Sequence, residues 1–183
     1  MVAGLIVVLA TPASLTNATG KALTHAAVTR NLTCDNNIGA GTGPNPAGTL
    51  TIGPVGLIGI VVSKPLTLAR LSDGVLWFKT YIVIPSSKEH RVELSVRSLD
   101  GGKIGLDWGT QQSDDAKHPH YTPANSLTTT TLSMSLCDGT SAGFPGGFVM
   151  TKPICAQVTV TAGKVRRSDR LSFGGAPCPA DAT

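Results

Sequence analysis

Alternation of hydrophobic and polar side chains is clearest in residues 90–97. Val92, Leu94 and Val96 alternate there with charged residues and a serine. Successive side chains of a strand point to opposite faces, so this period of two predicts a strand with one buried and one exposed face. Residues 130–136 and 156–161 show the same period. Three such segments predict a protein built mainly of strands.

Other strands are predicted from apolar runs that end at glycine or proline. Residues 75–84 are more continuously apolar than the alternating segments and rich in aromatic and β-branched side chains, which is typical of a central strand. Further strands are expected at 49–52, 57–63, 66–71, 103–108, 148–150 and 164–173. Turn signals separate them, among them Gly53-Pro54, Asp100-Gly101-Gly102 and Pro145-Gly146-Gly147. No segment has the caps and the 3.6-residue period of a long helix.

The spacing of these strands predicts an all-β fold, a two-sheet antiparallel sandwich that is immunoglobulin-like in a loose architectural sense. Composition agrees, because only 14% of the 183 residues are charged and the chain has 21 glycines and 12 prolines for turns. A chain of this length with 41% hydrophobic residues can bury a core.

The N-terminal region predicts export. Residues 2–10 form an uncharged apolar run that is too short to cross a membrane but matches the hydrophobic part of a signal peptide. No basic residue precedes the run, so either the true start lies upstream of Met1 or the run is a buried strand. Small residues offer two cleavage patterns, at Thr16/Ala18 and at Gly20/Ala22. We therefore expect a leader over residues 1–22, a flexible Gly/Pro-rich segment over 23–48, the sandwich over 49–178 and a tail over 179–183.

The four cysteines, Cys34, Cys137, Cys155 and Cys178, agree with a secreted or cell-envelope protein. An even count in an oxidising compartment predicts two disulfides, and the wide spacing disfavours a structural zinc site. The alternative is four reduced, buried thiols. Sequence leaves all three pairings open. We favour Cys137 with Cys155, which would close the intervening loop, and Cys34 with Cys178, which would tie the domain ends together.

The C-terminal quarter carries a resemblance. It contains Cys137-Asp138-Gly139, the run FPGGFVM over residues 144–150, Pro153-Ile154-Cys155, a Val-Thr-Val strand, and Phe173-Gly174 before Cys178. This pattern is similar to one in exported β-domain proteins of actinomycetes that have no assigned activity. The resemblance implies an exported β domain and transfers no catalytic residue.

Candidate chemistry is concentrated in the loop after Trp108. Asp107 and Tyr121 flank Asp114, Asp115, His118 and His120. Imidazole nitrogens with carboxylate oxygens suit zinc or copper, so the last four residues are candidate metal ligands. The opposing interpretation is a solvated loop, since Pro119 restricts the backbone between the two histidines. No Gly-x-Ser-x-Gly motif accompanies the loop, and we expect no catalytic residue and no cofactor unless this site holds metal.

Basic residues do not predict nucleic-acid binding. The net charge is +4, but the positive residues are dispersed and only 4% of residues are aromatic. Lys164, Arg166, Arg167 and Arg170 gather on one predicted strand, where charge protects a sheet edge or, alternatively, binds an anionic polymer. The glycine-rich residues 39–48 lack the strand, helix and lysine of a phosphate loop.

Two functions remain open. The first is a binding or structural module of the cell envelope or extracellular space, which contacts a ligand, an envelope component or a protein partner through loops and has no transmembrane span. The second is a metal-dependent or hydrolytic enzyme that uses residues 114–121. A β-sandwich supports either function, so the fold cannot decide between them.

Overall fold

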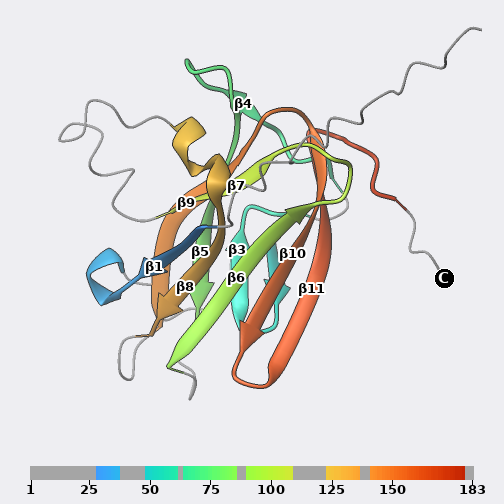
Figure 1. Cartoon of the computed structure of the whole chain (residues 1–183). Helices are drawn as coiled ribbons and strands as arrows, with labels where there is room; N and C mark the ends of the chain where they lie inside the picture. The colour runs from blue at the N-terminus through green and yellow to red at the C-terminus, as the bar shows by residue number, and fades with distance from the viewer. Residues whose placement is uncertain are drawn as a thin grey trace, which may run out of the picture.

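A computed structural model describes residues 28–37, 48–61, 64–85, 90–108, 123–136 and 141–179. These residues form strands β1 to β11 and two short 3-10 helices, η1 (Cys34–Asn36) and η2 (Pro123–Thr128). The strands form two sheets, so the predicted all-β sandwich is confirmed (Figure 1). The predicted leader, residues 1–22, lies outside the described residues.

The first sheet has five strands in the order β1-β8-β6-β10-β11. Their bounds are Val28–Leu32 for β1, Thr129–Ser135 for β8, Arg91–Ser98 for β6, Ile154–Ala162 for β10 and Val165–Phe173 for β11. All neighbours are antiparallel except β1 and β8, which run parallel. Figure 1 shows β6, β10 and β11 side by side, with β8 and β1 on the other side of β6.

The second sheet has the order β2-β3-β5-β9-β7, and β4 also pairs with β5. Its strands are β2 (Thr49–Ile52), β3 (Val55–Ile58), β4 (Ala69–Arg70), β5 (Leu76–Ile84), β7 (Ile104–Trp108) and β9 (Ala142–Met150). Gly53 and Pro54 form the two-residue turn between β2 and β3, and Gly53 has the positive φ that such a hairpin turn requires. All pairings in this sheet are antiparallel.

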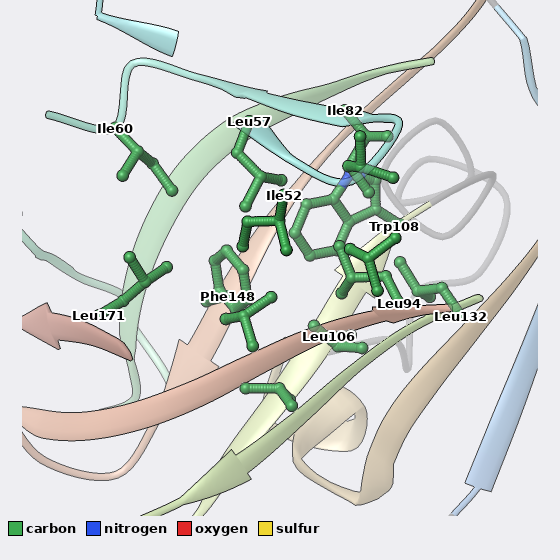
Figure 2. Close-up of a cluster of buried hydrophobic side chains, with 14 of the residues drawn as sticks. Ile52, Leu57, Ile60, Ile82, Leu94, Leu106, Trp108, Leu132, Phe148 and Leu171 are labelled. Atoms are coloured by element: carbon green, nitrogen blue, oxygen red, sulfur yellow. The ribbon is translucent and has the colours of Figure 1, made fainter. Parts of the chain in front are cut away.

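The core lies between the sheets and is centred on aromatic rings. Trp108 and Phe148 meet edge to face with ring centroids 5.2 Å apart, and Phe148 lies 5.0 Å from Phe173. Figure 2 shows Leu94 and Leu132 of the first sheet approaching Trp108 of the second. The Trp108 indole N–H donates a hydrogen bond to the Phe144 carbonyl, which satisfies the one polar atom this ring buries.

The alternating face predicted for residues 90–97 is confirmed. Val92, Leu94 and Val96 of β6 are buried, whereas Arg91 is exposed. A one-residue shift in register would exchange these two sets, so the hydrophobic pattern fixes how β6 lies in the sheet.

One predicted turn is part of a strand. Pro145, Gly146 and Gly147 were expected to precede a short strand at 148–150, but they lie inside the nine-residue β9. Among the described residues, pairing with β7 ends at Gly146, so Pro145, which has no backbone N–H, is paired only with Tyr81 of β5. A side chain at Gly146 would collide with the Trp108 ring, and one at Gly147 with Trp77. These glycines are present because the tryptophans pack against the backbone there. A run of proline and glycine is nevertheless typical of a turn, so the sequence alone suggests one.

Three further boundaries differ from expectation. Strand β1 lies within residues 23–48, where we expected a flexible segment, so the sandwich begins ahead of residue 49. The strand predicted at 57–63 is observed earlier, as β3. In the strand predicted at 66–71, only Ala69–Arg70 forms β4, while Leu66 makes an isolated bridge to Phe173.

The favoured disulfide pairing is wrong. Cys155 is bonded to Cys178, with their Cα atoms 5.0 Å apart, so neither Cys137–Cys155 nor Cys34–Cys178 can form. Cys34 is also disulfide-bonded, and Cys137 lies outside the described residues.

The tail after β11 explains the observed bond. Gly174 and Gly175 both have positive φ and turn the chain back. Hydrogen bonds then hold the returning chain, from the Ser172 hydroxyl to the Ala176 carbonyl and from Arg170 Nη1 to the Pro179 carbonyl. Cys155 pairs with Ser172 across the β10–β11 ladder, so the reversal returns Cys178 to it.

Candidate functional site

A groove opens where strand β8 separates from β6. Pairing between these strands ends at Ser95 and Thr131, whereas β6 continues to Ser98. The chain segment that enters β8 is η2, which packs on β7 of the other sheet. The opening is therefore bounded by β6, by the β6–β7 turn, by β7 and by the η2–β8 segment, and we call it the β6–β7 groove.

The groove has a volume of about 540 Å³, within the range of small-molecule sites. Its apolar wall consists of Val96, Ile104, Ala124 and Leu127, together with Gly102. Its polar rim consists of Arg97, Lys103, Ser98, Thr128 and Thr130. An apolar wall with a few polar groups at the mouth is the usual composition of a ligand site.

Helix η2 is placed by close packing and one buried hydrogen bond. A side chain at Gly105 would collide with the Ser126 carbonyl, so the glycine lets the η2 backbone rest directly on β7. Two residues along β7, the buried Asp107 carboxylate accepts a hydrogen bond of 3.1 Å from the Ser126 hydroxyl. A buried carboxylate needs such partners, and this contact fixes the η2 residues that line the groove.

A second contact holds the start of η2. The backbone N–H of Ala124 donates to Asp73 Oδ2 at 3.0 Å, and the other carboxylate oxygen of Asp73 accepts from the N–H of Val75. Asp73 lies in the turn between β4 and β5, so this carboxylate connects η2 to the second sheet at a point away from β7. Two separate anchors therefore set the position of the apolar groove wall.

The opposite wall is fixed by Asp100 in the β6–β7 turn. Its carboxylate accepts hydrogen bonds from the Ser98 hydroxyl at 3.2 Å and from the N–H groups of Gly102 at 3.3 Å and Cys155 at 3.0 Å. Desolvation raises the pKa of the Asp100 carboxyl, but these donors and the nearby charge of Lys152 together lower it below its ordinary value. The ionised Asp100 thus fastens the turn to the start of β10.

Two cations stand at the groove rim. Arg97 Nε donates to Gln157 Oε1 at 2.6 Å, which orients the guanidinium without neutralising it. Lys103 is exposed, and its backbone exchanges hydrogen bonds with Thr151. Within the described ranges neither side chain forms an ion pair; the ion pair recorded there joins Arg91 and Glu93.

The predicted metal ligands Asp114, Asp115, His118 and His120 lie outside the described residues, as does Tyr121. Asp107, which we grouped with them, is in β7 and contacts η2. Across the part of the chain that the structure describes, no three His, Cys, Asp or Glu side chains are grouped closely enough to hold a metal ion. Zinc or copper binding by residues 114–121 stays a prediction.

The predicted basic strand is β11, which lies at an edge of the five-stranded sheet. Arg166 and Arg167 of β11 and Lys164 just before it are exposed, in agreement with charge at a sheet edge. No helix among the described residues has the length and apolar character needed to cross a membrane.

Comparison with known proteins gives no relative to guide the assignment. No protein-family model matches the chain, and no curated protein is significantly similar to it. The function must therefore be inferred from the groove and its surroundings.

The groove residues were not singled out from the sequence. Val96 was predicted as a buried strand residue and Ile104 as part of a strand. Nothing in either segment indicates that β8 separates from β6 and leaves an opening beside η2. One signal was present, because the turn Asp100-Gly101-Gly102 has a basic residue on each side, at Arg97 and Lys103. The two cations can therefore be found from the local sequence, whereas the groove itself depends on how segments far apart in the sequence pack together.

Proposed function

We propose that this protein is an exported binding module of the cell envelope or extracellular space, and that it takes a small ligand in the β6–β7 groove. The observation that carries the proposal is the groove itself. It combines a volume of about 540 Å³ with buried apolar residues and a polar rim. Its two walls are held by Asp107, Asp73 and Asp100, so the site is formed before a ligand arrives.

Export is supported by the cysteines. Each described cysteine, Cys34, Cys155 and Cys178, is in a disulfide, which is typical of oxidising compartments. The apolar run at residues 2–10 and the resemblance to exported actinomycete proteins point the same way. N-terminal sequencing of material recovered outside the cell tests this part. Recovery of intact Met1 on the mature protein would overturn the leader interpretation.

Ligand binding is tested with a neutral fluorescent probe, N-phenylnaphthylamine, which brightens in apolar surroundings. The full, oxidised chain is titrated beside two variants that each add one aromatic ring. Thr130→Phe fills the groove, and Thr51→Phe adds the ring at an exposed position on β2. We expect Thr130→Phe to bind the probe about tenfold more weakly than the parent, a difference of roughly 1.4 kcal/mol.

Thr51→Phe should bind like the parent. The absence of probe binding to the parent, or equal binding by both variants, would contradict ligand binding in the groove. Circular dichroism of each variant establishes that the fold is intact, so a loss at Thr130 is read as occlusion of the site.

A further inference from the structure

The apolar wall of the β6–β7 groove suits a hydrocarbon chain. Val96 and Ile104 face the interior of the sandwich, with exposed fractions of 4% and 5%, and they still line the groove. Leu127 and Ala124 of η2 extend this wall outward. The groove thus joins the sandwich interior to the surface along apolar side chains, and a ligand there gains most from burying apolar area.

The rim adds positive charge at one end of this wall. Arg97 is held by its Nε hydrogen bond to Gln157, and no other hydrogen bond of its side chain is formed with the described residues. The planar guanidinium is therefore oriented and retains donors for a carboxylate or phosphate. Lys103 supplies a second cation across the β6–β7 turn.

The acidic residue nearest to these two cations, Asp100, forms no ion pair with either of them. Asp100 lies in the turn between the two cations, but its carboxylate accepts from Ser98, Gly102 and Cys155 and is paired electrostatically with Lys152. No carboxylate is among the described residues that line the groove. Charge complementarity therefore favours an anion at the rim.

We propose that the β6–β7 groove binds an amphiphile with an anionic headgroup, whose hydrocarbon chain lies along Val96, Ile104 and Leu127 while its headgroup contacts Arg97 and Lys103. This inference rests on the proposed ligand-binding function and names its ligand class. A carboxylate and a phosphate ester share the required chemistry, and the two are distinguished by experiment.

The test uses ligands of one chain length that differ only in headgroup, at neutral pH; the charged ligands are kept below their micelle concentrations and dodecanol below its solubility limit. Tridecanoate, dodecyl phosphate, dodecanol and dodecyltrimethylammonium, which share a twelve-carbon alkyl chain, are titrated against the full, oxidised chain, with displacement of N-phenylnaphthylamine as the readout. We expect one or both anions to bind about tenfold more tightly than dodecanol, and the cation to bind more weakly than dodecanol. The tighter of the two anions identifies the headgroup.

Variants assign the preference to the rim. Arg97→Gln and Lys103→Gln, each at an exposed position, should reduce the preference for the anion over dodecanol while leaving dodecanol binding unchanged. Arg91→Gln is the matched control, because Arg91 is an exposed arginine of the same strand outside the groove, and it should retain the preference. The preference of the parent should also fall as salt concentration rises.

The outcomes separate the two proposals. Equal binding of dodecanol and both anions would overturn the headgroup inference while leaving ligand binding in the groove intact. A preference that survives in both rim variants would also overturn it. If none of the ligands and no probe binds, the proposed function itself fails.

Discussion

Leu94 and Glu93 are neighbours in β6 with opposite surroundings. The Leu94 side chain is fully buried between the sheets, whereas the Glu93 side chain is 45% exposed and forms an ion pair of 3.3 Å with Arg91. Burial of an aliphatic side chain stabilises the fold through lost water contact and dense packing, while an exposed ion pair contributes little.

Leu94→Ala is therefore expected to lower the free energy of unfolding by about 2–5 kcal/mol, through lost burial and a residual cavity. Glu93→Ala should change it by about 0.5 kcal/mol or less. Denaturant melts of both variants beside the parent measure the two values. Equal, small losses would be incompatible with a half-buried β6.

Asp100 predicts a dependence of stability on pH. Its pKa in the folded protein is below the ordinary value of 3.8, so its ionised form is favoured by folding. This contribution is fully present above the unfolded pKa and is lost as pH falls through the lower, folded pKa. Asp100→Asn removes the charge and its titration.

The difference in free energy of unfolding between parent and Asp100→Asn should be largest from about pH 5 upward and should shrink on acidification below the unfolded pKa. Urea melts at a series of pH values measure it. A difference that stays constant with pH would show that the lost hydrogen bonds act without any contribution from the carboxylate charge.

At the level of elements, period-two alternation in the sequence predicted β6, β8 and β10. Burial alternates along β6, whereas β10 is buried on most of both faces because it lies between β6 and β11. Prediction from the sequence failed where the role of a residue depends on contacts with residues far away along the chain. The run Pro145-Gly146-Gly147 has the composition of a turn, yet the tryptophans that need its glycines lie far away in β5 and β7. The placement of η2 on Gly105 depends on the same kind of contact, so the apolar groove wall could not be predicted from either segment alone.

Gly105→Ala tests this dependence. The added methyl group would collide with the backbone of η2 at the Ser126 carbonyl, which cannot be relieved by a side-chain rotation. We expect a loss of about 1–3 kcal/mol in the free energy of unfolding, together with weaker binding of N-phenylnaphthylamine as Ala124 and Leu127 are displaced. Thermal or urea melts and the probe titration provide the two measurements.

Thr51→Ala is the control for this variant, because Thr51 is exposed on the same sheet and lies outside the groove. It should change stability by about 0.5 kcal/mol or less and leave probe binding intact. Unchanged stability in Gly105→Ala would mean that η2 is not held against β7.

Over the whole molecule, two contacts hold the segments that flank the five-stranded sheet. The tail after β11 is returned to Cys155 by the Gly174-Gly175 turn and is fixed there by the disulfide to Cys178. At the opposite side of the same sheet, the segment after β1 contacts the second sheet, where Asn37 Oδ1 accepts a hydrogen bond of 2.7 Å from the Gly143 N–H. The sequence predicted disulfides but not their pairing, because pairing depends on which strands become neighbours.

The complete disulfide connectivity can be tested by peptide mapping, because the sequence allows each cysteine to be released in a separate peptide. Cys137 and Cys155 share one tryptic peptide, because Lys152 precedes a proline, but cyanogen bromide cleaves between them at Met150. Combined digestion of unreduced protein yields four cysteine peptides, spanning residues 31–70, 135–150, 151–164 and 171–183. We expect mass spectrometry to find 151–164 linked to 171–183, as Cys155–Cys178 requires. Cys34 is also bonded, and Cys137 is the one remaining cysteine of the sequence, so 31–70 should be linked to 135–150. A link between 135–150 and 151–164 would instead mean that Cys155 pairs with Cys137, and the tail could not then be fixed to the face of the five-stranded sheet.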